Sequence, residues 1–489
     1  MVRKIHTRLM IPENNPHSFD TRGFVFALAC LVCVVVLFAG VRYGTEVAAD
    51  QIISANLENL PETELKLEEI KAKRTMRSVG EVKLLEKLQE YEATLSTRTI
   101  GTASADILSL AHEKFIGADL TNMKLYLYEN GYAVATYDIA SKGKRGSRWE
   151  TPTGLYKIET KEEDHFSTIG EVHMPYSMQF FGNFFIHGWP YYPGGEPVAE
   201  GYSGGCIRLS TEEATKVFEF AARGTPIFVW EGDSGTTTIS VSKRALPKVS
   251  AQSFLIADIS SGKVFAEKDA AEKLPIASLS KLLVALVANE TIHFDRTLTI
   301  SKDDRVQSEG TPGSLLAGDT FTVGDLLYPL IMESNNAVAY ALARYEGESM
   351  FVQWMNDKAR AIGMSDTFIE EPSGLSENNT ASARDLFKLM KYIHDSQSFI
   401  LNVSRTPTKK IIAESGRSYM IGNFNVFAGN PQFLGGKTGY TDEAHETMTA
   451  IFEVPIGKEK ATVAIIVLGS KDRKADVERL LAWFKSATR

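Results

Sequence analysis

One short segment in the second half of the chain could support nucleophilic catalysis by a serine. Ser278 and Lys281 lie three residues apart in PIASLSKLL, a spacing that places both side chains on one face at the start of a helix. The residues after Lys281 are nearly all apolar, so this helix should be buried, and burial lowers the pKa of a lysine because it disfavours the charged amine. A neutral Lys281 could accept the hydroxyl proton of Ser278, and the helix N-terminus would favour negative charge developing there.

Two further triplets decide how this spacing is interpreted. An isolated Ser-x-x-Lys is common and mostly marks a helix start with a surface lysine. Here Ser334-Asn335-Asn336 follows the apolar segment LLYPLIM (Leu326 to Met332), and Lys437-Thr438-Gly439 follows a pair of glycines. All three in this order are the signature of penicillin-binding proteins and serine β-lactamases.

Residues 250–489 resemble the D-alanyl-D-alanine carboxypeptidases of the low-molecular-weight penicillin-binding-protein family. The strings MNDKARAIGMSDTFIEEPSGLSENNTASARDL and GGKTGYTDEA support the resemblance. It implies an α/β (α+β) domain of the penicillin-binding-protein type, with β-lactam antibiotics as covalent inhibitors. It also implies a role for each site residue. Ser278 is then the nucleophile and Lys281 its base, while Ser334 and Asn336 serve as proton relay and substrate amide contact. Lys437, Thr438 and Gly439 anchor the substrate, and the amides of Ser278 and Tyr440 form the oxyanion hole.

One position in this domain departs from the family pattern. Glu371-Pro372 stands where Asn-Pro is more usual, and class A β-lactamases carry a deacylating glutamate before proline at a similar interval after their Ser-x-Asn triplet. A β-lactamase is therefore an alternative to the carboxypeptidase. The surrounding string favours the carboxypeptidase.

The first half of the chain contains a candidate cysteine nucleophile. In IHGWPYYPGGEPVAEGYSGGCIRLS, His187 ends an apolar strand nineteen residues before Cys206. An imidazole could take the thiol proton, and the amides of a Gly204-Gly205-Cys206 turn could approach an oxyanion closely. Arg208 could bind a carboxylate. On these residues alone, a structural cysteine with an unrelated histidine is an equal alternative.

The wider string favours the catalytic interpretation. Residues 115–231 resemble the L,D-transpeptidase catalytic domain (YkuD type), with DLTNMKLYLYENG, TPTG, IHG and SGGCIR in the order of that family. The resemblance implies that His187 is the general base, Cys206 the acyl-accepting nucleophile and Arg208 a substrate-binding residue, with the amides of Gly205 and Cys206 as oxyanion donors. Gly204 departs from the pattern, because many members carry a larger polar residue there.

Strands and helices should position both sites. Residues 123–140 form two β-rich runs around Asn130-Gly131, which predicts a hairpin. Ser210 and Glu213 form a capping box, so a helix should begin just after Cys206. The first domain is therefore predicted to be mainly β, with further strands in 183–189 and 225–230. In the second domain we expect strands at 254–259 and 462–469 and helices at 281–290 and 475–487.

The N-terminus is predicted to anchor the chain in a membrane. Residues 23–41 form an uncharged apolar run long enough to span a bilayer as a helix. The basic residues that precede it should keep the N-terminus cytoplasmic and the rest of the chain exported: Arg3, Lys4, Arg8 and Arg22. A cleaved signal peptide, cut near 47–49, is the alternative. Cys30 and Cys33 lie inside the run, which leaves Cys206 as the single exported thiol.

The chain thus divides into a cytoplasmic N-terminus (1–22), a transmembrane anchor (23–41), a partly helical stalk (42–114), the cysteine domain (115–231), a linker (232–249) and the serine domain (250–489). The net charge of −8 argues against nucleic acid as a partner. Peptidoglycan stem peptides are the expected substrates of both sites, and neither reaction needs a metal or an organic cofactor. A wall-binding scaffold with one inactive site is the alternative from another class.

Overall fold

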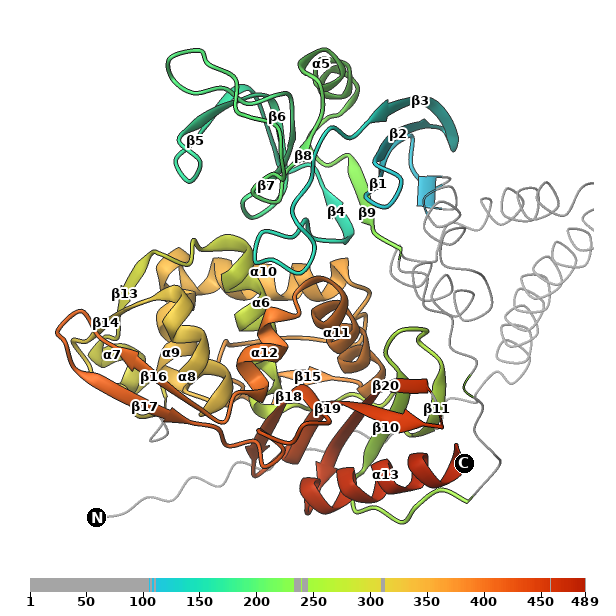
Figure 1. Cartoon of the computed structure of the whole chain (residues 1–489), viewed down its shortest axis with the longest axis vertical. Helices are drawn as coiled ribbons and strands as arrows, with labels where there is room; N and C mark the ends of the chain where they lie inside the picture. The colour runs from blue at the N-terminus through green and yellow to red at the C-terminus, as the bar shows by residue number, and fades with distance from the viewer. Residues whose placement is uncertain are drawn as a thin grey trace, which may run out of the picture. The chain divides into compact units, whose positions relative to one another are not determined.

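A computed structural model of the chain describes residues 105, 108–109, 111–232, 239, 245–308, 313–457 and 459–488. The predicted anchor at 23–41 and nearly all of the predicted stalk lie outside these residues. Among the helices that are described, none combines the length and the apolar character needed to cross a bilayer. The described chain contains a mainly β domain followed by a mixed α/β domain (Figure 1).

A five-stranded sheet forms one half of the first domain. Its order is β3-β2-β1-β9-β4, and only the β1–β9 pair is parallel. The strands are β1 (Lys114–Asp119), β2 (Lys124–Glu129), β3 (Tyr132–Asp138), β4 (Gly154–Lys157) and β9 (Pro226–Trp230). The turn between β2 and β3 places Asn130 at φ 53° and Gly131 at φ 83°, the left-handed conformations of a tight hairpin turn. The predicted hairpin is therefore confirmed.

The second sheet of this domain carries the histidine and the cysteine. Its order is β5-β6-β7-β8, with β5 (Thr160–Ser167), β6 (Val172–Phe181), β7 (Phe184–His187) and β8 (Ile207–Arg208). Helix α5 (Thr211–Phe220) follows at once, and the Ser210 hydroxyl accepts from the Glu213 amide at its start, as predicted. Ile116, Phe180 and Val217 belong to one buried cluster, so both sheets and α5 share a core.

An antiparallel sheet is the centre of the second domain. Its order is β11-β10-β20-β19-β18, formed by β11 (Val264–Lys268), β10 (Ser253–Asp258), β20 (Glu459–Ser470), β19 (His445–Ile456) and β18 (Phe433–Thr441). Because side chains alternate along a strand, Ile466 packs with the helices on one face, whereas Ile465 packs with Phe484 of α13 (Arg473–Ala487) on the other. Strand β18, which contains Lys437, lies at the edge of this sheet.

The remaining helices form a second layer on the sheet (Figure 1). They are η1 (Ala277–Ser280), α6 (Lys281–Thr291), α7 (Lys302–Val306), α8 (Val323–Met332), α9 (Asn336–Glu346), α10 (Glu348–Ala361), α11 (Ala383–Ser396) and α12 (Phe399–Arg405). Three strand pairs lie among them: β12 (Leu274–Pro275) with β15 (Thr380–Ala381), β13 (Thr297–Thr299) with β14 (Thr320–Thr322), and β16 (Thr408–Ile412) with β17 (Ser418–Gly422).

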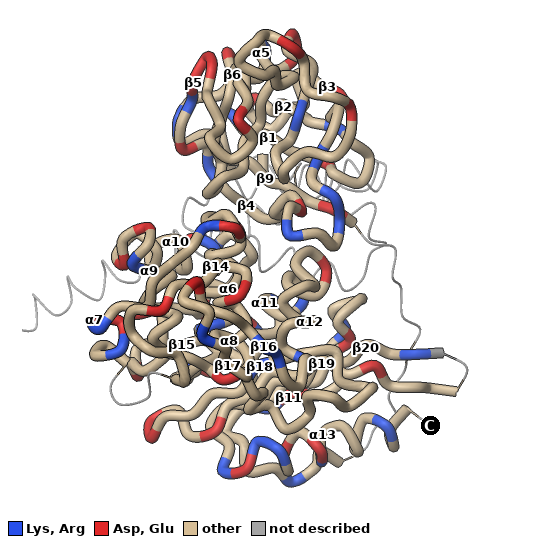
Figure 2. Tube along the Cα trace, turned by 60° about the vertical axis from the view of Figure 1, so that its left-hand side comes forward, with Lys and Arg blue, Asp and Glu red and all other residues tan. Residues whose placement is uncertain are grey.

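Helix α6 is buried along its whole length, as the apolar run predicted. Its far end contains a charge, because Glu290 forms a fully buried ion pair with Lys358 of α10 at 2.8 Å. The Tyr392 hydroxyl of α11 donates to the same carboxylate at 2.9 Å. Such a paired charge fixes the end of a helix whose start contains Ser278 and Lys281. Along the chain trace, Lys and Arg are interspersed with Asp and Glu (Figure 2).

Candidate active sites

The turn η1 and the start of α6 bring Ser278 and Lys281 together. The Lys281 Nζ lies 2.9 Å from Ser278 Oγ and also donates to the Ser373 carbonyl. The Lys281 side chain is fully buried, whereas Ser278 is half-buried and so can be reached from outside. Burial lowers the pKa of Lys281 to about 7, against the opposing negative charge of Glu371. A substantial fraction of this amine is therefore neutral at neutral pH and can accept the serine proton.

The other two triplets meet through Lys437. Its Nζ donates to Ser334 Oγ at 2.9 Å and to the Thr438 carbonyl at 2.8 Å. Ser334 lies in the turn between α8 and α9 at φ 59°, and Asn336 is the first residue of α9. Burial, with the charges of Lys281 and Arg473, holds the pKa of Lys437 well below its usual value. A negatively charged substrate group would relieve this repulsion between cations.

Strand β18 passes directly beside the nucleophile. A Cβ on Gly439 would lie only 2.9 Å from the Ser278 amide nitrogen, and Thr447 of β19 donates from Oγ1 to the Ile276 carbonyl at 3.1 Å. Tyr440 follows Gly439 on the strand and projects an exposed ring whose hydroxyl bonds Asp442. The predicted oxyanion pair, the amides of Ser278 and Tyr440, thus comes from two adjoining segments. Its role stays a prediction.

Parallel pairing of β7 and β8 brings the second set of residues onto one sheet face. Ile186 pairs with Ile207 and His187 pairs with Arg208. Since paired residues point the same way and side chains alternate, Cys206 lies on the face that carries His187 and Arg208. The buried His187 ring has its Nδ1 2.6 Å from the Gly188 carbonyl. A carbonyl can only accept, so Nδ1 carries the proton and Nε2 is left as the base.

Cys206 is buried in an apolar setting. It packs with Val172, Met174 and Phe185, and its thiol donates to the Asn183 carbonyl at 3.7 Å. Burial raises the pKa of Cys206 to about 11 and lowers the pKa of His187 to about 4. The pair therefore rests as a neutral thiol and a neutral imidazole.

The turn before Cys206 requires glycine at one position and not at its neighbour. Gly205 has φ 103°, and a Cβ there would come within 2.3 Å of the Phe184 ring. At Gly204 a Cβ would meet nothing within 4 Å, so a larger residue would fit. The Gly205 amide, a predicted oxyanion donor, instead donates to the Ser203 hydroxyl at 3.1 Å. Sequence reasoning missed Ser203, because an ordinary serine next to a Gly-rich turn carries no distinguishing pattern.

Arg208 is half-buried beside the cysteine. Its guanidinium lies 5.9 Å from the Trp189 ring centre, and its buried Nε has no hydrogen-bond partner within the described residues. A guanidinium with an unused donor suits a carboxylate, and the substrate-binding role of Arg208 stays a prediction. Over the described residues there is no group of three or more His, Cys, Asp or Glu side chains that could hold a metal ion.

Glu371 occupies a place that its sequence position did not reveal. Its carboxylate accepts from the amides of Ser373 and Gly374, both at 2.6 Å, and from the Tyr340 hydroxyl at 3.1 Å. Sequence reasoning singled out Glu371-Pro372 but missed Ser373, whose carbonyl contacts Lys281. Only the structure joins these residues to the serine site.

Ser278 and Lys281 have the geometry of an acyl-transfer site, in which a side-chain nucleophile lies within hydrogen-bond distance of its base, whereas His187 and Cys206 share one face of a sheet. Residues 239–471 match the family described as D-alanyl-D-alanine carboxypeptidase, and residues 113–229 match the L,D-transpeptidase catalytic domain (YkuD). The chain belongs to the D-alanyl-D-alanine carboxypeptidase family and carries in addition an L,D-transpeptidase catalytic domain.

Curated relatives cover the serine half. A D-alanyl-D-alanine endopeptidase of Pseudomonas aeruginosa is 30% identical over 267 residues, which is 52% of this chain and 85% of the relative. The carboxypeptidase DacB2 of Mycobacterium tuberculosis is 30% identical, over 41% of this chain and 70% of the relative. A solved D-alanyl-D-alanine carboxypeptidase of M. tuberculosis is 25% identical with a TM-score of 0.45, over 51% of this chain and 95% of that structure.

Proposed function

We propose that this chain is a bifunctional enzyme of peptidoglycan remodelling. Its serine site would remove the terminal D-Ala from pentapeptide stems, and its cysteine site would use the resulting tetrapeptide stems as acyl donors. The serine part of the proposal is carried by two hydrogen bonds of 2.9 Å, one joining Lys281 to Ser278 and the other joining Lys437 to Ser334. The cysteine part is supported by the pairing of His187 with Arg208 beside Cys206.

At the serine site, Lys281 takes the proton of Ser278 while the Ser278 oxygen attacks the carbonyl of the bond between the two D-Ala residues. The amides of Ser278 and Tyr440 stabilise the oxyanion. The terminal D-Ala leaves as an amine after receiving a proton through Ser334, and water then hydrolyses the acyl-serine ester. Lys437 and Thr438 bind the substrate carboxylate, and Asn336 contacts the stem amide. β-Lactams would acylate the same serine.

At the cysteine site, Nε2 of His187 takes the thiol proton as Cys206 attacks the carbonyl before the remaining D-Ala. A thioester forms and D-Ala leaves with the proton from His187. An amine of a neighbouring stem, or water, then attacks the thioester and releases Cys206. Arg208 binds the stem carboxylate. For the Gly205 amide to serve the oxyanion, its bond to Ser203 must be exchanged for the substrate oxygen.

The pairing of these sites on one chain has a chemical reason. The tetrapeptide that the serine site releases is the donor that the cysteine site consumes, and joining the two domains raises the local concentration of this intermediate. Such substrates lie outside the cytoplasmic membrane. We therefore propose that the catalytic domains are exported and that residues 23–41 hold them at the membrane, with domain limits as set out from the sequence.

A second activity at the serine site is favoured by the relatives. Three of them, from P. aeruginosa, Escherichia coli and Haemophilus influenzae, are D-alanyl-D-alanine endopeptidases. An endopeptidase cuts the D,D bond within a cross-link, which involves the same nucleophile and base but a substrate with a bulky leaving group. A cross-linked substrate must therefore be tested beside the pentapeptide.

The test incubates the chain with disaccharide pentapeptide, disaccharide tetrapeptide and a D,D-cross-linked dimer, and follows the products by mass spectrometry. Ser278→Ala should leave the pentapeptide intact, and Cys206→Ala should leave the tetrapeptide intact. Cleavage of the dimer that is lost in Ser278→Ala would identify the endopeptidase. If the unmodified chain changes none of the three substrates, the chain is a wall-binding scaffold and the bifunctional proposal is wrong.

A further inference from the structure

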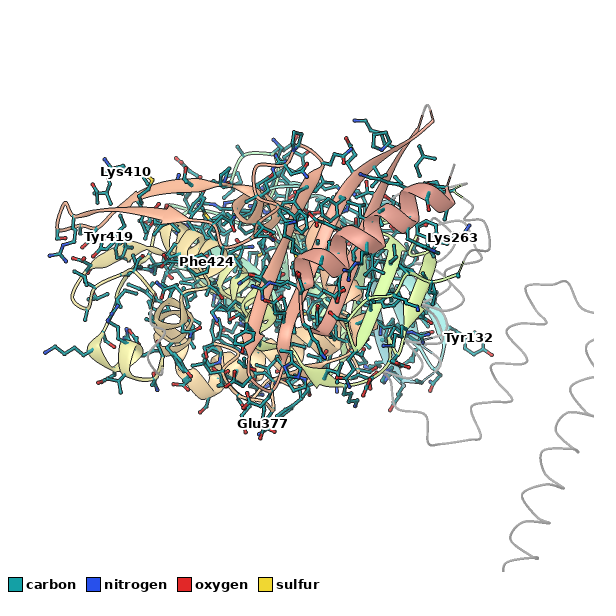
Figure 3. All side chains as sticks on the ribbon, turned by 90° about the horizontal axis from the view of Figure 1, so that it is seen from below. Tyr132, Lys263, Glu377, Lys410, Tyr419 and Phe424 are labelled. Atoms are coloured by element: carbon teal, nitrogen blue, oxygen red, sulfur yellow. The ribbon has the colours of Figure 1, made fainter. Side chains whose placement is uncertain are left out.

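The loop from Glu370 to Asn379 is organised around one carboxylate. Both oxygens of Glu371 accept from this loop: the Ser373 amide and hydroxyl at 2.6 Å each, the Gly374 amide at 2.6 Å, the Ser376 amide at 3.2 Å and the Asn379 side-chain amide at 3.1 Å. Glu377, labelled in Figure 3, lies on the exposed outer part of the loop. Glu371 therefore holds the inner part in one conformation.

The inner part of this loop packs against the nucleophile turn. Gly374 has φ 85°, and a Cβ there would lie 2.2 Å from the Ala277 carbonyl oxygen and 2.9 Å from the Ser278 amide nitrogen. The Asn379 carbonyl accepts from the Ile276 amide at 2.9 Å. The loop thus contacts the backbone that leads into the serine, from the Ile276 amide to the Ser278 amide.

The same loop orients the base. The fully buried Ser373 accepts from Lys281 Nζ through its carbonyl, while its amide and hydroxyl both donate to Glu371. The Lys281 amine is therefore held between Ser278 Oγ and a carbonyl whose position depends on Glu371. This connection runs from a carboxylate to the nucleophile without any direct contact between the two.

We propose that Glu371 is a positioning residue of the serine site, which acts through Ser373 to aim the Lys281 amine at Ser278. The inference rests on the proposed function, since it takes Lys281 as the base. It assigns Glu371 a role before acylation, unlike the deacylating glutamate of a class A β-lactamase. Both carboxylate oxygens are already engaged by loop donors and Tyr340, which suits a structural anion better than an activator of water.

The charges around Lys281 give the proposal a measurable signature. Glu371 is the anion that opposes the effect of burial on the Lys281 pKa, and the cation beside Lys281 is Lys437, itself influenced by Arg473. Removing the negative charge of Glu371 leaves burial and the nearby cation, so the Lys281 pKa should fall below about 7. A lower pKa means that the base becomes neutral at lower pH.

The experiment measures Ser278 acylation by a fluorescent penicillin, and hydrolysis of the acyl-enzyme, across pH in the full chain. For Glu371→Gln we expect an acylation rate constant lower by about 10- to 100-fold, as for a misplaced reacting group. We also expect the fall of the acylation rate at acidic pH (the acid limb of the pH profile) to move by about one pH unit or more toward lower pH, because the negative charge of Glu371 no longer raises the Lys281 pKa. Hydrolysis of the acyl-enzyme should change much less than acylation.

Two variants serve as controls. Glu370→Gln changes the neighbouring carboxylate, which bonds Ser376 and Asn378 on the outer loop, and should leave both acylation and its pH profile unchanged. Glu371→Asp keeps the charge and should restore the acid limb. If Glu371→Gln unfolds the chain, Ser373→Ala tests the same connection, since it removes one donor to Glu371 but keeps the carbonyl, and should slow acylation by several-fold.

Each outcome decides between the claims. If the unmodified chain is never acylated, the proposed function fails before the inference is tested. An unmodified chain that is acylated, with Glu371→Gln behaving identically, overturns the inference alone. Slower acylation with an unmoved acid limb would reduce Glu371 to a loop stabiliser, and a block confined to hydrolysis would make it the deacylating residue of a β-lactamase.

Discussion

The serine and cysteine sites each contain a proposed nucleophile and a buried proposed base, yet the two pairs rest in different states. Lys281 lies 2.9 Å from Ser278, and burial lowers its pKa to about 7, so the serine base is ready at neutral pH. At the other site, burial leaves Cys206 with a pKa of about 11 and His187 with a pKa of about 4, and the thiol donates to the Asn183 carbonyl. The first pair is in hydrogen-bond contact, whereas the second pair rests as two neutral groups with the thiol bonded to a backbone carbonyl.

The difference follows mainly from what burial does to each kind of group. Burial disfavours the charged amine of Lys281 and so lowers its pKa, although the negative charge of Glu371 opposes this shift. The charge of Lys281 in turn helps to lower the pKa of Lys437. At Cys206 the charge of Arg208 lowers the thiol pKa, but the opposite effect of burial is larger.

Exchanging the two nucleophiles for alanine separates the sites most strongly. Ser278→Ala should lower the removal of D-Ala from pentapeptide by at least about 10³-fold, because the attacking atom is gone. Cys206→Ala should do the same to tetrapeptide turnover. Each variant should keep the other activity within about twofold of the unmodified chain, as measured by mass spectrometry. Loss of both activities in either single variant would show that the sites are not separate.

The buried ion pair at the far end of α6 should affect the stability of the fold and not the chemistry of the serine site. Lys358→Ala leaves Glu290 buried without its cation, and breaking a buried pair in this way costs about 3–5 kcal/mol. The matched control is Lys474→Ala on α13, which breaks an exposed pair with Glu478 and should cost about 0.5 kcal/mol or less. Denaturant unfolding followed by circular dichroism measures both. Equal effects would mean that Lys358 does not hold α6.

The activity of the serine site should depend on pH through the lowered pKa of Lys281. With neutral Lys281 as the proposed base, kcat/KM for pentapeptide should fall as pH drops through about 7, approaching a tenfold loss for each unit below it. Measurements of kcat/KM in a series of buffers at constant ionic strength give this pH dependence. A flat profile down to the carboxylate range would rule out Lys281 as the base.

The resting state of the cysteine should appear as slow alkylation. Since only the thiolate reacts, the rate of Cys206 modification by iodoacetamide in the free chain should keep rising with pH through the neutral range, toward a pKa of about 11. Intact-mass spectrometry follows the modification, with Cys206→Ala as the blank. A rate that is already constant in mildly acidic buffer would instead indicate a thiolate–imidazolium pair.

Local patterns predicted much of what positions the two sites. The apolar run after Lys281 predicted α6, Asn130-Gly131 predicted the hairpin, and Ser210 with Glu213 predicted the start of α5. The proximity of Lys437 to Ser334, 103 residues apart, was implied only by resemblance. Spacing cannot reveal such contacts, because the tertiary fold creates them.

Other features depend on burial, which a lone residue type does not disclose. Lys358 looks like an ordinary helix surface residue in the sequence, yet it is fully buried and paired. Ser203 accepts from the Gly205 amide and Ser373 accepts from Lys281, and no motif marks either serine. The catalytic roles themselves stay predictions for both sites.

A single time course tests the central claim, that the serine site supplies the cysteine site. The chain is given only disaccharide pentapeptide whose two D-Ala residues carry different isotopic labels, and released D-Ala and cross-linked products are followed by mass spectrometry. We predict that D-Ala with the terminal label is released first, and that D-Ala with the second label and the L,D-linked products appear after a lag. Ser278→Ala should abolish the release of both labels and the formation of L,D-linked products. L,D-linked products formed from pentapeptide by Ser278→Ala at the unmodified rate would contradict the account.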